Sequence, residues 1–333
     1  MTARFELDSS VCVAQYDKLK ACCDSVSYSS KTNPLVTPIL EEKTDSLFSV
    51  HNRKELARVS DKSRVLYFGL AWTQEDVQQL YDIGVRTFVI DTVPDYDILL
   101  ASLTEPVTVF LRMKLKERSI RSERYYVFGM DTKDVFDLID KNTLHTMGIH
   151  VHRKTQNVNE WNLVDDISEV IPESILKKIA FINIGGGIPS EYTNTRLTTV
   201  SGVLTKIKLF HEWANKLDIK VITEPGRYIC APAAKLITKI VRITGSTLIV
   251  DASVYNAYTD SVFGSQRLKV QGELETGTPY LIKGITPDSI DIFRYRVYLD
   301  DPKEGDELVF LNAGAYNFPT DFCDLEKVET IIK

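Results

Sequence analysis

Short runs of β-branched and aromatic residues alternate with amphipathic stretches from Ser25 to Gly226. Each run has the length and composition of a buried strand, and we count eight of them: SVSYSSK, SLFSVH, RVLYFGL, RTFVID, VTVFLRMKL, MGIHVHR, IAFINIGGG and KVITEPG. The stretches between them have helical character: NPLVTPILEEK, NRKELARVS, TQEDVQQLYDIG, TKDVFDLIDKN, VNEWNLVDDISEVI and SGVLTKIKLFHEWANKL. The pattern predicts an α/β fold, a (β/α)8 TIM barrel, with a doubly wound sheet as the competing arrangement.

After Ala231 the pattern changes to strand-like segments separated by Gly, Pro or Asp turns. The opening RFELD is also strand-like and precedes a predicted helix, VCVAQYDKLKACC. We therefore predict a barrel domain over residues 9–230 and a discontinuous all-β domain over residues 1–8 plus 231–333. The second domain is expected to resemble a β-sandwich or β-barrel, and its sheet is expected to take up the N-terminal strand.

Composition excludes several classes of protein. The formal net charge is -6 and no long basic run occurs, which argues against nucleic acid as a partner. The five cysteines lack metal-ligand spacing, so no metal site is predicted, and their odd count fits a reducing cytosol. The first ten residues lack the apolar region of a signal peptide, and no apolar run approaches about 20 residues. We expect a cytoplasmic protein that does not enter a membrane.

Polar residues and glycines occur where the predicted strands end, and in a barrel these ends carry the catalytic groups. They are Lys31, His51, Asp91, Arg112, His150, His152, Gly185, Gly186, Gly187, Glu224, Gly226 and Arg227. Each has an ordinary structural interpretation: a lysine on the rim, a histidine in the core, glycines in a strand-to-helix turn. Their joint occurrence at successive strand ends is what indicates a site.

Together these residues suit a phosphorylated aromatic cofactor that bears an aldehyde. Lys31 can form an imine with the aldehyde, and the flat ring of His150 can stack on the cofactor ring. Backbone N–H groups of the triple glycine, with Arg227, can hold a phosphate dianion. Glu224 can pair with a protonated pyridine nitrogen and so keep the ring an electron sink.

Seven segments carry a family resemblance: YSSKTNP, VFLRMKL, IHVHR, NIGGGIPS, ITEPGRYICAPA, IVDASVYN and LVFLNAGAYNF. They resemble, in the same order, motifs of the ornithine/arginine/diaminopimelate decarboxylases, pyridoxal 5'-phosphate (PLP) enzymes of the alanine-racemase-like barrel fold. The resemblance implies that Lys31 is the Schiff-base lysine, His150 the ring-stacking histidine and Glu224 the partner of the pyridine nitrogen. It further implies that the phosphate contacts include Arg227 and Tyr316, and that Arg112 lies near the cofactor.

The segment IKGITPDSID departs from the family pattern. Pro287 stands where relatives have a catalytic cysteine, which leaves the proton donor unassigned: Lys31, a nearby histidine or an ordered water. Asp288 matches the family aspartate that reads a substrate's distal ammonium from across a dimer interface, and its alternative role is that of a turn residue after Pro287.

Further departures lie in the barrel. Ser49 replaces an acidic residue of the second strand, with His51 nearby, and His152-Arg153 replaces a Gly-Ser pair. Arg153 adds positive charge for the cofactor phosphate or for a second anionic group on a large substrate. The segment KLKERSIRSERYYVFGM leaves little room for a long closing loop and favours a bulky substrate.

The resemblance implies a PLP-dependent decarboxylase, a carboxy-lyase. Its substrate is expected to be a basic amino acid, or an aminocarboxypropyl group of a larger molecule in polyamine biosynthesis or nucleotide-peptide antibiotic biosynthesis. A homodimer with shared active sites is expected, and a second tailoring domain or enzyme is a further candidate partner. Two alternatives stay open: a racemase or epimerase using Tyr255 as second acid/base, and a regulatory homologue. Pro287 favours the latter, while Lys31, Glu224 and Arg227 speak against it.

Overall fold

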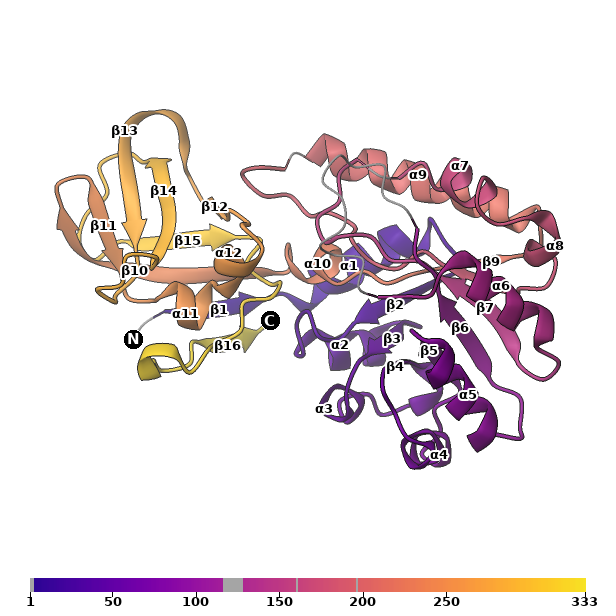
Figure 1. Cartoon of the computed structure of the whole chain (residues 1–333). Helices are drawn as coiled ribbons and strands as arrows, with labels where there is room; N and C mark the ends of the chain where they lie inside the picture. The colour runs from indigo at the N-terminus through magenta and orange to yellow at the C-terminus, as the bar shows by residue number, and fades with distance from the viewer. Residues whose placement is uncertain (1–2, 116–127, 160, 196) are drawn as a thin grey trace. The chain divides into compact units, whose positions relative to one another are not determined.

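The computed structural model describes residues 3–115, 128–159, 161–195 and 197–333. The chain forms two compact units, which we describe separately (Figure 1). The barrel unit comprises Gln15–Pro189 and Thr199–Gly226, and the β unit comprises Met1–Ala14, Ser190–Thr198 and Arg227–Lys333. The domains predicted from the sequence, residues 9–230 and residues 1–8 plus 231–333, remain a prediction.

Eight parallel strands close into a barrel in the barrel unit. They follow one another in chain order, and β2 pairs with β9 to complete the ring. The strands are β2 (Ser25–Ser29), β3 (Leu47–Val50), β4 (Val65–Gly69), β5 (Thr87–Ile90), β6 (Thr108–Arg112), β7 (Thr146–His150), β8 (Phe181–Asn183) and β9 (Lys220–Thr223). The predicted (β/α)8 barrel is confirmed, and the doubly wound alternative is wrong.

The barrel interior is filled by apolar side chains. Leu66, Val89, Phe110 and Ile222 form one buried cluster, although β9 is separated from β4, β5 and β6 in the ring. Since side chains alternate between the two faces of a strand, such a contact across the ring requires that all four point inward. This cluster shows that the barrel interior is a packed apolar core rather than an open channel.

Helices surround the strands in Figure 1. They are α2 (Val36–Lys43), α3 (Arg53–Leu56), α4 (Gln74–Asp82), α5 (Val93–Ser102), α6 (Thr132–Lys141), α7 (Leu163–Ser168), α8 (Glu173–Leu176) and α9 (Leu197–Asn215), preceded by α1 (Ser9–Lys20). The sequence pattern missed α5 and α8. The start of α5 has a recognisable signal, because the Thr92 hydroxyl accepts from the Asp95 N–H and a proline occupies the first turn.

The β unit contains a mixed sheet. Its main path runs β12 (Lys269–Val270), β15 (Glu307–Leu311), β10 (Ala234–Thr244), β11 (Thr247–Val250), β13 (Leu274–Lys283) and β14 (Ile292–Tyr298). The indigo β1 (Arg4–Leu7) pairs antiparallel with β10 (Figure 1), which confirms that this sheet takes up the N-terminal strand.

Several elements of the β unit were not predicted. The last strand, β16 (Glu329–Ile332), runs parallel to β1. Three short helices also occur: α10 (Arg227–Cys230), α11 (Val254–Ala257) and α12 (Thr259–Phe263). Among the described residues, no helix combines the length and the apolar character that crossing a bilayer requires.

Candidate active site

The predicted site residues of the barrel unit follow its strands. His51 comes directly after β3, Arg112 and His150 end β6 and β7, and Glu224 comes directly after β9. In a closed parallel barrel all carboxyl ends meet at one mouth, so the structure brings these side chains together.

The sequence predicted Lys31 at the last position of a strand. In the structure Lys31 lies in the turn that follows the strand. The strand β2 ends at Ser29, whose carbonyl accepts from the N–H of Thr32 at 3.0 Å. This turn packs closely against Gly226: a Cβ added there would lie 2.0 Å from Thr32 Oγ1. Only glycine allows the Glu224–Gly226 loop to approach the Lys31 turn so closely.

A buried hydrogen-bonded cluster forms the floor of the mouth. His150 Nε2 lies 3.2 Å from Glu224 Oε2, and Asn183 Nδ2 donates to Glu224 Oε1 at 2.8 Å. Burial alone would raise the pKa of Glu224, but the charge of His150 and the hydrogen bonds from His150 and Asn183 lower it to about 2. Glu224 is therefore an ionised carboxylate at neutral pH.

The triple glycine joins β8 to this floor. Gly185 and Gly187 have φ of +67° and +87°, which favours glycine. A Cβ at Gly186 would also lie only 2.7 Å from the carbonyl oxygen of Glu224. The Gly185 N–H donates to Asn183 Oδ1 at 2.9 Å, and the Gly186 N–H to Nδ1 of the exposed His152 at 3.3 Å. Two backbone N–H groups of the loop thus donate to Asn183 and His152, side chains that lie beside Glu224.

Lys31 is exposed, and its Nζ lies 3.4 Å from His51 Nε2. Partial desolvation lowers the pKa of Lys31; Glu224 and Glu55 oppose this effect, and Arg112 adds to it. A lowered pKa increases the fraction of free amine, which is the nucleophilic form.

The two predicted site arginines of the barrel unit, Arg112 and Arg153, have acidic partners. Arg112 donates to Asp91 at 3.1 Å, and the buried Arg153 donates to Asp166 at 3.2 Å. The Arg153 guanidinium also lies over the ring of Trp161, 5.6 Å from its centre. Whether either arginine contacts a cofactor stays a prediction.

Arg227 and Tyr316 belong to the β unit. Arg227 is buried, makes two hydrogen bonds to the carboxylate of Asp260 and donates to the Tyr192 hydroxyl at 2.8 Å. Its guanidinium lies 5.0 Å from the centre of the Tyr316 ring. The predicted phosphate contacts of Arg227 and Tyr316 remain predictions.

Asp288 also belongs to the β unit and organises a turn. Its Oδ1 accepts from the N–H of Ile290 at 2.8 Å. The preceding loop is fixed by the buried Asp291, which accepts from the Thr286 N–H and hydroxyl at 3.0 and 2.7 Å. The turn interpretation of Asp288 therefore has a structural basis, while its substrate role stays a prediction.

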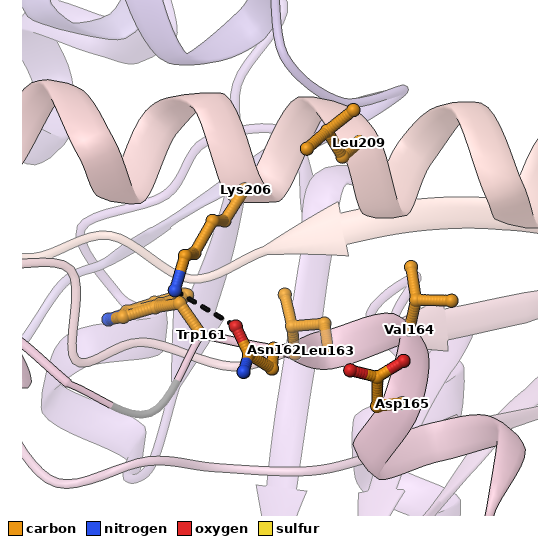
Figure 2. Close-up of a pocket in the computed structure, with 7 residues that line it drawn as sticks. All are labelled: Trp161, Asn162, Leu163, Val164, Asp165, Lys206 and Leu209. Atoms are coloured by element: carbon orange, nitrogen blue, oxygen red, sulfur yellow. Dashed lines mark hydrogen bonds between the residues drawn. The ribbon is translucent and has the colours of Figure 1, made fainter.

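A surface hollow lies outside the barrel mouth, between α7 and α9 (Figure 2). In it, Lys206 donates to Asn162 Oδ1 at 2.9 Å, as the dashed line shows. The remaining lining residues are Trp161, Leu163, Val164, Asp165 and Leu209. None of the predicted site residues lines this hollow, so it does not mark the chemistry.

His150, His152 and Glu224 also have donor atoms within 4.8 Å of one another, a spacing that a metal ion accepts. The hydrogen bond between Glu224 and His150 already accounts for part of this proximity. We therefore describe the three residues as part of the polar barrel mouth and assign no metal to them.

Sequence reasoning missed three residues of the mouth. Asn183 opens the NIGGG segment, directly before the glycine loop, and its position could have drawn attention. Glu55 stands three residues after Asn52, which is the spacing of a helix N-cap signal. Phe68, whose ring lies 4.7 Å from that of His51, has no sequence signal that separates it from other strand residues.

The chain resembles known proteins over most of its length. The family model described as "Pyridoxal-dependent decarboxylase, pyridoxal binding domain" matches residues 13–231. The diaminopimelate decarboxylase of Methanothermobacter thermautotrophicus is 26% identical over 322 residues, covering 87% of this chain and 74% of the relative. The lysine/ornithine decarboxylase of Selenomonas ruminantium is 24% identical over 276 residues, covering 77% and 68%.

Among solved structures, the lysine/ornithine decarboxylase of Vibrio vulnificus, complexed with cadaverine, superposes with a TM-score of 0.81 at 21% identity. The superposition covers 100% of this chain and 94% of that one, which shows a shared fold. Because the family model covers most of the chain, including Lys31, His150 and Glu224, the chain belongs to the pyridoxal-dependent decarboxylases, and hence to the carboxy-lyases.

Proposed function

We propose that this chain decarboxylates a basic amino acid at the barrel mouth, with Lys31 and Glu224 as the two essential groups. The observation that carries the proposal is the placement of an amine, Lys31, and a buried carboxylate, Glu224, at one mouth of a closed barrel; Glu224 is ionised, and burial lowers the pKa of Lys31. A buried carboxylate is costly unless a cation or a strong hydrogen-bond donor uses it. A protonated pyridine nitrogen is such a partner.

The residues present fit PLP. The amine of Lys31 suits covalent attachment, and the backbone cradle at Gly185–Gly187 has no room for a Cβ. Among the described residues, His150 Nδ1 is buried without a hydrogen-bond partner, so this atom is available to a group bound at the mouth. When bound, PLP supplies an aldehyde for attachment and an electron-poor ring that accepts the electron pair left by CO2.

The chain's own residues then have separable roles. Lys31 would hold the cofactor by its amine and give it up to the substrate amine, while the negative charge of Glu224 would keep a proton on the ring nitrogen. His150 covers one ring face and is fixed by its hydrogen bond to Glu224. His152 is exposed and can turn away from the Gly186 N–H, which frees that donor for a phosphate oxygen.

For the substrate we favour a free diamino acid over an aminocarboxypropyl group on a larger molecule. The relatives are named for the decarboxylation of such substrates, diaminopimelate in one case and lysine or ornithine in the other. The positive charge of Arg153 would meet a second anionic group on a larger substrate, but Asp166 already pairs with that charge. The prediction of a short closing loop rests on the segment 114–130, of which residues 116–127 lie outside the described residues.

The test is CO2 release from diaminopimelate, lysine, ornithine, carboxynorspermidine and an aminocarboxypropylated nucleotide, with added PLP. We expect release from at least one of the first three. A chelator should leave the activity unchanged, because we assign no metal. Release from the last two alone would transfer the function to polyamine or antibiotic tailoring, and release from none would contradict the proposal.

The same samples discriminate the two alternatives. A racemase would interconvert enantiomers without CO2 release, and it would need Tyr255 as a base. Burial and the charge of Asp288 raise the pKa of Tyr255 to about 12, which makes it a poor base at neutral pH. A regulatory homologue would develop no visible absorption band with PLP.

We further propose a homodimer in which Asp288 of one chain serves the Lys31 site of the other. Mixing Lys31→Ala with Asp288→Ala chains should then restore part of the activity that each variant lacks, because some mixed dimers contain one intact site. Each variant alone serves as the control. Absence of any recovery, with mixed dimers demonstrated by mass, would indicate self-contained sites.

A further inference from the structure

His51 connects Lys31 to a buried carboxylate. Its Nε2 lies 3.4 Å from Lys31 Nζ, and its Nδ1 lies 3.2 Å from Glu55 Oε2. The ring is stacked on Phe68, with centroids 4.7 Å apart and planes 17° apart. His51 is therefore held in one orientation between an amine and a carboxylate.

Glu55 is fixed by three further hydrogen bonds. Its Oε1 accepts from Asn52 Nδ2 at 2.6 Å, and its Oε2 accepts from the backbone N–H of His51 at 3.0 Å. Its own N–H donates to Asn52 Oδ1 at 2.9 Å, which caps α3. Only 6% of the Glu55 surface is exposed.

These contacts define the tautomer of His51. Burial alone would raise the pKa of Glu55, but its hydrogen bonds with His51 and the nearby charges lower it, so Glu55 is ionised and can only accept. The proton of a neutral His51 ring thus sits on Nδ1, facing Glu55. The lone pair of Nε2 then faces Lys31.

The surrounding charges favour proton exchange at this point. Glu224, Glu55 and Arg112 act electrostatically on Lys31, alongside its loss of hydration. His150, the histidine of the floor, is buried and hydrogen-bonded to Glu224. By contrast, 29% of the His51 side chain is exposed, so this ring can exchange protons with solvent.

We propose that His51 is the proton carrier of this site: it takes a proton from the Lys31 ammonium and returns one, through Lys31, to the carbon that loses CO2. The inference rests on the proposed function. In the first transfer an N–H bond of Lys31 breaks, its electron pair stays on Nζ, and a new N–H bond forms at Nε2. The return transfer reverses these changes and restores the Lys31 ammonium. An N–H bond of Lys31 then breaks as a C–H bond forms, with the electron pair left by CO2 making the new bond. Water replenishes the proton that the product carries away.

The roles of the neighbours follow. Glu55 is a positioning residue, since it stabilises the imidazolium and fixes the ring. Pro287, at the place of the family's thiol, offers no proton. His51 supplies the donor that this position lacks.

The test compares His51→Gln with wild type. Glutamine keeps a polar group near Lys31 but cannot carry a proton. We expect kcat to fall about 100-fold with little change in KM, since general acid–base catalysis contributes this order of magnitude. His211→Gln is the matched control. His211, on α9, forms a similar pair with Asp24, with Nε2 and Oδ2 3.1 Å apart, and its substitution should leave kcat unchanged.

A second readout requires no cofactor. The rate at which acetic anhydride labels Lys31, followed by mass spectrometry over a range of pH, should show two steps in wild type because two coupled groups share a proton. The His51→Gln variant should show one step. Circular dichroism and thermal melting establish that each variant is folded.

The outcomes separate the two claims. Full kcat in His51→Gln, or a two-step labelling profile in that variant, would overturn the inference while leaving decarboxylation intact. A wild-type protein without decarboxylase activity would overturn the proposed function, and the labelling profile would still decide whether His51 and Lys31 share a proton.

Discussion

The barrel mouth contains two pairs of histidine and glutamate with the same separation and different surroundings. Glu224 lies 3.2 Å from His150 on the floor, and Glu55 lies 3.2 Å from His51 beside Lys31. The first imidazole is fully buried, whereas the second is partly exposed and touches an amine. The difference indicates that burial decides the role of such a pair: a permanent charge in the first case and a mobile proton in the second.

The largest effect is expected where both pairs act on the same group. Lys31→Ala removes the amine between them and should lower kcat/KM by at least about a thousandfold, since covalent attachment is lost. Lys31→Arg keeps the positive charge but cannot attach, and should be equally inactive. Steady-state assays with the best substrate of the panel measure both, and activity in the arginine variant would contradict attachment.

The second prediction separates the two carboxylates. Glu224→Gln should lower kcat by about 100- to 1,000-fold, as expected when one preorganised electrostatic group is lost. Glu55→Gln should cost about tenfold, because the proton carrier remains but loses its stabilising partner. The comparison fails if the two variants lose activity equally, or if Glu55→Gln loses more.

The third prediction concerns stability at low pH. The pKa of Glu224 is lowered from its usual 4.5 to about 2, so the unfolded chain binds this proton more readily than the folded one. Its contribution, on the order of 3 kcal/mol, should be present above pH 4.5 and be lost as the pH falls toward 2. Urea midpoints between pH 5.5 and 3 should decline more steeply in wild type than in Glu224→Gln, and parallel curves would contradict the assignment.

The smallest effect concerns the contact between the Lys31 turn and the Glu224 loop. Gly226→Ala would place a Cβ 2.0 Å from Thr32 Oγ1 and should destabilise the fold by about 1–3 kcal/mol. Gly202→Ala on α9 is the matched control, because a Cβ there meets nothing within 4 Å and should stabilise by about 0.5–1 kcal/mol. Thermal melting measures both, and a neutral Gly226→Ala would show that the turn can shift.

Local patterns predict the barrel well, since each of the eight strands lies in a short apolar run of the sequence. The candidate site residues were found because they lie in segments that resemble family motifs in the same order along the chain. The exact place of Lys31 was missed because SSK remains β-prone, and the end of β2 depends on the hydrogen bond from Thr32 and the close approach of Gly226. Such contacts join residues far apart in sequence, so no local pattern encodes them.

The same reason explains the other omissions. The strand β16 is four residues long and pairs with β1 at the opposite end of the chain, so its register depends on a distant partner. Asn183 and Glu55 are ordinary polar residues until the fold brings them to Glu224 and His51. The order of residues indicates which polar side chains stand at strand ends. The hydrogen bonds that assign roles to these side chains form only in the closed barrel.

Attachment of the cofactor to one amine tests the central claim most directly. Purified protein is incubated with PLP, reduced with borohydride, digested and analysed by peptide mass spectrometry, with Lys31→Arg treated alongside. We predict a visible absorption band before reduction and a pyridoxyl adduct on the peptide that carries Lys31. A colourless protein, or an adduct that persists in Lys31→Arg on another lysine, would contradict the account.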